Sequence, residues 1–130
     1  MGARRPREVV LDTSALIGIE RRDGRMAALL AASLRTPVRF LVPAGVLAQA
    51  WRDGARQTRL ARFLKTPAVE VLPLTDALAR AAGVLCGLSR TSDVVDASVV
   101  LAARERRCPI VTGDPEDLGA LDPSLRLHLL

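Results

Sequence analysis

The strongest constraint on the fold is a series of short apolar runs, separated by longer stretches in which apolar residues follow helical spacing. The runs occupy residues 8–11, 38–42, 69–72 and 109–112, and their length is typical of buried strands. Residues 125–130 alternate weakly and predict a further strand at an edge. Strands that alternate with helices form a parallel sheet with helices on both faces. We therefore expect an α/β fold, a three-layer α/β/α sandwich around a central, mostly parallel sheet of four to five strands.

The stretches between these runs carry helix starts and breaks. Thr13 or Ser14 can cap the first helix, Thr75 a later one, and Ser92 or Asp93 the one after that. We expect helices through residues 17–22 and at 25–34, 43–53, 57–64, 76–88, 93–107 and 115–121, with Gly54 loosening the third. No internal repeat, linker or low-complexity segment interrupts this pattern, so residues 1–130 are predicted to form a single domain.

Composition narrows the class of protein. Hydrophobic residues make up 49% of the 130-residue chain, enough for a core without disulfide staples. The basic start, residues 1–8, and the short apolar run behind it do not fit a secretory signal. No apolar stretch approaches the roughly 18 residues of a membrane span. Cys86 and Cys108 lack metal-binding spacing and make no disulfide framework, so we expect a reduced, cytoplasmic protein outside the membrane.

Charge is unevenly distributed along the chain. Residues 24–69 contain one acid, Asp53, and eight bases, whereas residues 70–130 contain nine acids and six bases. A basic surface beside an acidic site suits a polyanionic substrate, although for a basic stretch taken alone ordinary solvated helix faces are the favoured interpretation. The only aromatic residues are Phe40, Trp51 and Phe63, so base stacking on an aromatic platform is not expected.

Aspartates stand where two of the predicted strands end. Asp12 follows the first run and Asp114 follows the fourth, and sites in parallel sheets form beyond the carboxyl ends of the strands. Asp93 and Asp96 are three residues apart at a helix start, and Asp117 follows Asp114 at the same spacing. Converging carboxylates repel one another and favour a hard divalent cation such as Mg²⁺ or Mn²⁺, which takes oxygen ligands.

Structural roles compete with this metal site. Asp93 suits an N-cap, Asp117 the first turn of a helix, and Asp12 a plain strand-to-helix turn. Spacing alone therefore leaves both interpretations open.

Three segments resemble the motifs of PIN domains, in the same order and strand–helix context. They are Leu11-Asp12-Thr13-Ser14-Ala15-Leu16-Ile17, Asp93-Val94-Val95-Asp96-Ala97 with the helix that follows, and Val111-Thr112-Gly113-Asp114-Pro115-Glu116-Asp117-Leu118. The resemblance covers nearly the whole chain, and the short single-domain form is similar to VapC toxins of bacterial toxin–antitoxin pairs.

The resemblance implies a Mg²⁺- or Mn²⁺-dependent endoribonuclease. It implies metal ligands at Asp12, Asp96 and Asp114, with Asp117 as a helper and Asp93 as a second choice. It also implies an RNA substrate, a homodimer, and an antitoxin whose tail covers the acidic site. A hydroxyl of Thr13 touching the metal is a further possibility.

The chain departs from the family pattern at one acid. Where the family usually has a glutamate, in the helix after the second strand, this chain has Gln49. Glutamine keeps one carbonyl oxygen but loses the charge, so we expect it to orient water or substrate and to bind a second metal less well. Asp53, four residues on, is a candidate substitute, and a solvated aspartate beside Arg52 and Arg56 is the alternative.

The remaining candidates are weaker. Arg52, Arg56 and Arg59 follow helical spacing and are candidates for contacts with RNA phosphates, surface acids or an antitoxin. His128, the only histidine, lies at the end of the chain and is not expected to act as a base.

Two functions stay open, an active ribonuclease and a weak or inactive relative that only binds RNA or protein. A phospho-acceptor receiver domain is disfavoured because the only lysine, Lys65, lies in the basic middle of the chain. A dehalogenase-type phosphatase is disfavoured because Ser14 stands where a second aspartate is needed.

Overall fold

The expected alternation of strands and helices is present in the computed structural model, which describes residues 6–129. The basic start at residues 1–5 and Leu130 lie outside the described residues. In chain order the elements are β1 (Arg7–Leu11), α1 (Thr13–Glu20), α2 (Gly24–Ser33), β2 (Val38–Pro43), α3 (Ala44–Ala50), α4 (Thr58–Leu64), β3 (Val69–Leu72), α5 (Asp76–Ser89), α6 (Val94–Arg106), β4 (Ile110–Thr112), α7 (Pro115–Leu121) and β5 (Leu127–Leu129).

The five described strands form one sheet in the order β3-β2-β1-β4-β5. Every neighbouring pair is parallel, so the sheet is wholly rather than mostly parallel. β1 lies at the centre, with Val10 opposite both Leu41 of β2 and Ile110 of β4. The weakly alternating last strand is β5, and it pairs with β4 at the edge as expected. The carboxyl ends of β1 and β4 therefore meet at one edge of the sheet.

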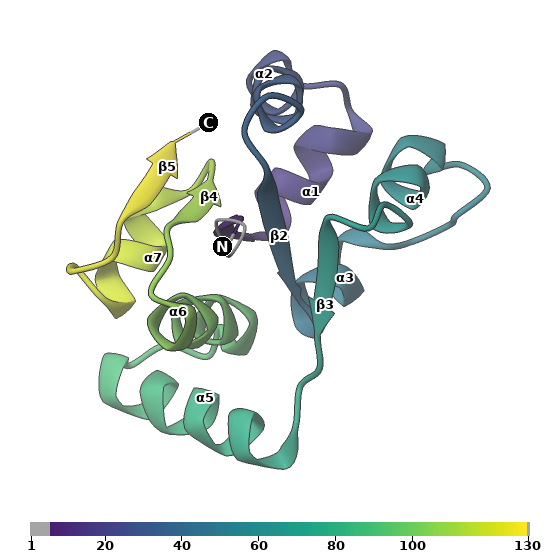
Figure 1. The fold of residues 1–130 in the computed structure, drawn as a ribbon. Coiled ribbons are helices and arrows are strands. Elements are labelled where there is room, and N and C mark those ends of the chain that lie inside the picture. The colour runs from purple at the N-terminus through teal and green to yellow at the C-terminus, as the bar shows by residue number, and fades with distance from the viewer. Residues whose placement is uncertain (1–5, 130) are drawn as a thin grey trace.

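Helices cover the sheet in two layers, which confirms the three-layer sandwich (Figure 1). α1 packs on β1 and β4 and is backed by α2 and α4, while α6 packs on β1 and β2 and is backed by α5 and α7. The strand side chains between these layers are fully buried, among them Leu11, Leu41, Val42, Ile110 and Val111. Because these strands are buried on both faces of the sheet, their sequences are continuous apolar runs.

Asp12, Asp23, Thr75 and Asp93 cap helices α1, α2, α5 and α6, each accepting a backbone N–H of the first turn through its side chain. Two of these caps, Asp12 and Asp93, also belong to the predicted acidic site. The caps therefore fix where the helices begin and, with them, where these two carboxylates stand.

Helix α3 is shorter than expected, because it ends at Ala50 rather than near Asp53. Trp51 is extended, and the side chain of Gln57 accepts the N–H groups of Arg52 and Asp53 while donating to the carbonyl of Ala50. A single glutamine thus satisfies the backbone that another helical turn would have used, which explains why the prediction was wrong.

Both cysteines, Cys86 and Cys108, are free and buried. Burial raises the pKa of the Cys108 thiol. No helix among residues 6–129 is long and apolar enough to cross a membrane.

Candidate active site

Asp12 follows β1 directly and is almost fully buried, with 4% of its surface exposed. Its Oδ1 accepts the backbone N–H of Ala15 at 3.0 Å and the hydroxyl of Ser14 at 2.6 Å. Its Oδ2 accepts the hydroxyl of Thr112, at the end of β4. The helix-cap role is therefore present, and it coexists with a rigidly oriented carboxylate at the carboxyl edge of the sheet.

The start of α1 and the end of β4 are joined by two hydroxyl groups. Thr112 accepts the backbone N–H of Asp114 at 2.8 Å while it donates to Asp12. Ser14 accepts the backbone N–H of Gly113 at 2.8 Å while it donates to Asp12. These hydroxyls hold residues about 100 positions apart in register. A β-carbon at Gly113 would lie 3.4 Å from Ser14 Oγ, so the loop approaches α1 closely.

Asp96 lies in the first turn of α6 and is partly buried. Asp93 caps that helix by accepting the N–H of Asp96 at 2.9 Å. Burial, followed by the negative charges of Asp93, Asp117 and Asp12, raises the pKa of Asp96 to about 7. The negative charges of the neighbouring carboxylates therefore all act on the carboxyl group of Asp96 and disfavour its ionised form.

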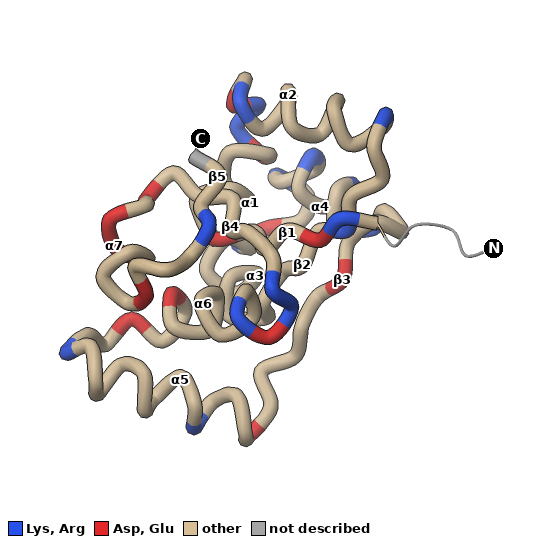
Figure 2. Tube along the Cα trace, turned by 60° about the vertical axis from the view of Figure 1, so that its left-hand side comes forward, with Lys and Arg blue, Asp and Glu red and all other residues tan. Residues whose placement is uncertain are grey.

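Asp117 lies in the first turn of α7 and shares a cavity of about 210 Å³ with Asp93 and Asp96. Asp114 begins α7 without a side-chain cap, is exposed, and lines a neighbouring cleft beside Ser14. Figure 2 shows the acidic positions of α7 and of the start of α6 on the same side of the molecule. The tertiary structure thus brings together four of the predicted aspartates and places Asp114 beside them.

The chemistry of this donor set fits a hard divalent cation, because every ligand is a carboxylate oxygen and Asp96 is held among like charges. Among residues 6–129, however, no three acidic, histidine or cysteine side chains stand close enough to share an ion in their present positions. Asp114 and Asp117 are exposed at the surface.

Gln49 lies near the end of α3, and its Oε1 accepts the hydroxyl of Thr13 at 2.6 Å. Thr13 immediately follows Asp12, so Gln49 is held beside the aspartate cluster. Thr13 occupies one of the two lone pairs of the amide oxygen, so the –NH₂ group is the part of Gln49 that stays free to donate. This donor can contact a phosphate oxygen but cannot ligate a cation.

Asp53 lies in the loop after α3 and not one helical turn beyond Gln49. Its Oδ1 accepts the N–H of Ala55 at 3.0 Å, and its Oδ2 lies 3.8 Å from Arg56. Both contacts are local, as in an ordinary surface turn.

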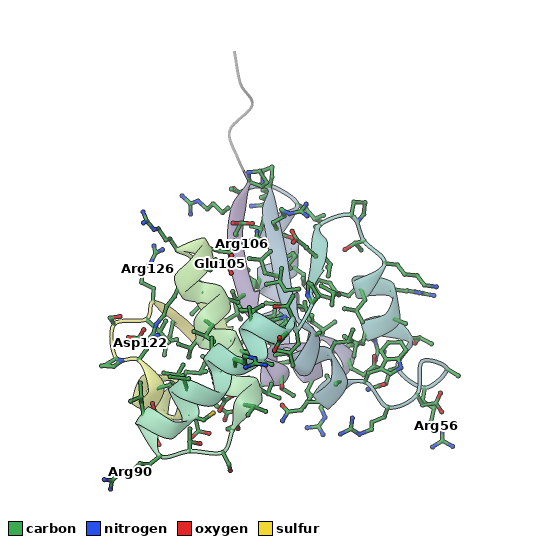
Figure 3. The ribbon with its side chains drawn as sticks, turned by 90° about the horizontal axis from the view of Figure 1, so that it is seen from below. Arg56, Arg90, Glu105, Arg106, Asp122 and Arg126 are labelled. Atoms are coloured by element: carbon green, nitrogen blue, oxygen red, sulfur yellow. The ribbon has the colours of Figure 1, made fainter. Side chains whose placement is uncertain are left out.

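The arginines at positions 52, 56 and 59 do not form a continuous row of side chains available to bind phosphates. Arg52 donates to the carbonyls of Ala48 and Trp51 at the end of α3, and Arg59 donates to the carbonyl of Glu20 at the end of α1. Figure 3 shows Arg56 on the outer loop, pointing away from the rest of the protein. Helix carbonyls attract such cations, so Arg52 and Arg59 have structural roles here.

Sequence reasoning missed Thr112 as a site residue. It also gave Thr13 or Ser14 as the cap of the first helix, whereas Asp12 caps α1 and Ser14 donates to Asp12. The sequence signal that could have identified Thr112 is a hydroxyl residue at a strand end, two positions before Asp114. His128 is exposed and lies on β5, paired with Val111 in the strand register.

Comparisons with known proteins agree with the fold. The family model described as PIN domain matches residues 9–121. The sequence has no significant match among curated proteins. Among solved structures, the chain resembles VapBC2 from Rickettsia felis bound to promoter DNA, with 16% identity, a TM-score of 0.69, and coverage of 94% of this chain and 98% of that one.

Two further structures share the fold. VapC20 of Mycobacterium tuberculosis, described as a toxin that cleaves the sarcin–ricin loop, has 20% identity, a TM-score of 0.61, and coverage of 85% and 95% of the two chains. The PIN domain endonuclease Utp24 has 19% identity, a TM-score of 0.55, and coverage of 87% and 74%. With a family model spanning residues 9–121 and an all-parallel sheet that carries the acidic motifs at its carboxyl edge, this chain belongs to the PIN-domain family.

Proposed function

We propose that this protein is a Mg²⁺- or Mn²⁺-dependent endoribonuclease and the toxin of a type II toxin–antitoxin pair. The observation that carries the proposal is the convergence of Asp12, Asp93 and Asp117 on the partly buried Asp96. Like charges gathered in this way destabilise the protein unless a cation neutralises them. A destabilising cluster of like charges at the carboxyl edge of a parallel sheet is typical of a functional site.

In this proposal Asp12, Asp96 and Asp114 hold the cation, and Asp117 assists them. A Mg²⁺ or Mn²⁺ held there would activate water and neutralise charge on the phosphate. Addition of water to phosphorus, with cleavage of the P–O3′ bond and protonation of the leaving O3′, leaves 5′-phosphate and 3′-hydroxyl ends. Asp12 needs no reorganisation, because Thr112 and Ser14 already fix its two oxygens.

Gln49 has a different role from the acid it replaces. Its amide –NH₂ is directed by the hydrogen bond from Thr13 and is suited to contact a phosphate oxygen of the substrate. The same geometry favours a second candidate function, a weak or inactive PIN domain that binds RNA or protein without turnover. Gln49→Glu distinguishes the two, because activity that appears only in this variant would identify the wild type as inactive.

Partners are inferred by analogy. The solved relatives include a toxin–antitoxin complex from Klebsiella pneumoniae and FitAcB from Neisseria gonorrhoeae. We infer a cognate antitoxin, a homodimer and a cytoplasmic location for this protein on the same pattern.

The test is cleavage of a total RNA pool by the purified protein with Mn²⁺, followed by mapping of the new ends. Asp96→Asn is the sharpest variant, because the hydrogen bond that caps α6 at this position uses the backbone N–H and not the carboxylate. We expect it to abolish cleavage without unfolding the protein, and Asp12→Asn to do the same.

The matched control is Asp76→Asn, which changes an exposed aspartate paired with Arg80 on α5. It should cleave like the wild type. Unchanged cleavage by Asp12→Asn and Asp96→Asn, or full wild-type cleavage in EDTA, would refute the proposal.

A further inference from the structure

A second cleft adjoins the aspartate cluster, and it contains arginines. It has a volume of about 500 Å³ and lies between the α1–α2 turn and the loop that follows β4. Arg21 and Arg25 line it from one side, and Ser14, Gly113 and Asp114 line it from the other. Because Ser14 also donates to Asp12, this cleft opens directly beside the candidate catalytic carboxylates.

Both arginines are exposed, and their guanidinium groups have no hydrogen-bond or ion-pair partner among residues 6–129. Asp23 lines the same cleft, but its Oδ1 accepts the backbone N–H groups of Arg25 and Met26 at 2.8 and 3.3 Å and caps α2. This oxygen of Asp23 is therefore committed to the backbone. Neither guanidinium forms an ion pair with Asp23 or with Asp114, the two acids that line the same cleft.

The other basic candidates differ from this pair. Arg52 and Arg59 donate to helix carbonyls, and Arg56 contacts Asp53 on the outer loop. On the opposite side of the cluster, the described residues that line the cavity shared by Asp93, Asp96 and Asp117 include no basic one. Figure 2 shows basic positions around the start of α2 and acidic ones along α7, so the charge changes sign across the site.

We propose that Arg21 and Arg25 bind a backbone phosphate of RNA, next to the phosphate that reaches the aspartate cluster. This inference rests on the proposed function and specifies how the substrate approaches. Arginine matches phosphate geometry through paired N–H donors, whereas the acidic cavity repels phosphate unless a cation is bound. An RNA strand lying along this gradient enters at the α1–α2 turn and crosses Asp114 toward Asp96.

The test measures binding without catalysis. Fluorescence anisotropy of a fluorescein-labelled single-stranded RNA is recorded in EDTA across a salt series for the wild type, Arg21→Gln, Arg25→Gln and the double variant. Because the two arginines bind one phosphate, the double variant should reduce the slope of log affinity against log salt by about 0.7, and each single variant by a part of this. In cleavage assays with Mn²⁺, KM should rise more than kcat falls.

Arg35→Gln is the matched control, because this exposed arginine lies just before the amino end of β2, whereas the site lies at the carboxyl ends of the strands. It should keep the wild-type slope. Equal slopes for the wild type and the double variant would overturn the proposal. A poly-glutamate peptide tests the other occupant: if the double variant loses affinity for the peptide alone and keeps RNA binding, the cleft recognises an acidic protein segment.

These outcomes are separable from those of the nuclease proposal. A wild-type protein that never cleaves RNA, but whose salt slope falls in the arginine variants, would refute the catalytic function while supporting the phosphate site.

Discussion

Replacing Asp96 by asparagine should stabilise the metal-free protein while abolishing its activity. In the folded state, burial and the charges of Asp93, Asp117 and Asp12 raise the pKa of Asp96 from 3.8 to about 7. Below about pH 4 the carboxyl group is protonated in both the folded and the unfolded protein, and it has no effect on their balance. Between about pH 4 and 7 the unfolded state releases this proton more readily, so the wild type loses stability as pH rises, and above pH 7 the loss is constant.

The size of the effect follows from the width of that window. About three pH units at about 1.4 kcal/mol each give an upper value near 4 kcal/mol. Because the Asp96 carboxyl is only partly buried and water screens some of the repulsion, we expect about half of this, roughly 2 kcal/mol at pH 8. Asparagine keeps the shape of the side chain and carries no charge, so it removes the penalty.

Urea unfolding in EDTA at pH 4 and pH 8 measures the difference. Asp96→Asn should match the wild type at pH 4 and exceed it at pH 8, whereas Asp76→Asn should match it at both. Adding Mn²⁺ should then stabilise the wild type, by about 2.7 kcal/mol at one hundred times the dissociation constant, and stabilise the variant far less. A variant less stable than the wild type at pH 8, or a difference that does not depend on pH, would refute the idea that carboxylates crowd Asp96.

Three further predictions concern the scaffold. Hydrogen bonds, foremost those from Ser124, lower the pKa of buried Asp122 to about 2. Asp122→Ala should therefore lower the free energy of unfolding by about 2 kcal/mol at pH 7. In urea unfolding, this difference between variant and wild type should shrink as the pH falls from about 4 to 2. A β-carbon at Gly18 would lie 2.9 Å from buried Met26 Cγ, so Gly18→Ala should lower the thermal midpoint despite its better helix propensity, at a net cost of about 1 kcal/mol. Thr112→Val removes the hydroxyl that orients Asp12, the carboxylate proposed to hold the cation, so kinetics should show a lower kcat at nearly unchanged RNA affinity. A change in affinity alone would contradict this.

The alternation of strands and helices could be read from the sequence because its causes are local. Continuous apolar runs such as Val9–Leu11 fit strands buried on both faces, and hydroxyl or aspartate caps mark the helix starts. The aspartates at the strand ends could be placed near one edge for a similar reason, since parallel strands end on the same side of a sheet. The end of α3 could not be predicted from the sequence, because it depends on a hydrogen bond from the side chain of Gln57 to the backbone carbonyl of Ala50.

By itself, then, the sequence determined the fold class and the identity of the acidic residues, through local periodicity and through motifs that occupy few positions. The tertiary structure decided what each charge does. It joined Thr112 to Asp12 across 100 positions, gathered three carboxylates around Asp96, and committed Arg52 to a helix end while leaving Arg21 open to a cleft. The physical reason is that burial and charge neighbours, which set the protonation and partners of a side chain, come from residues distant in the chain and exist only after folding.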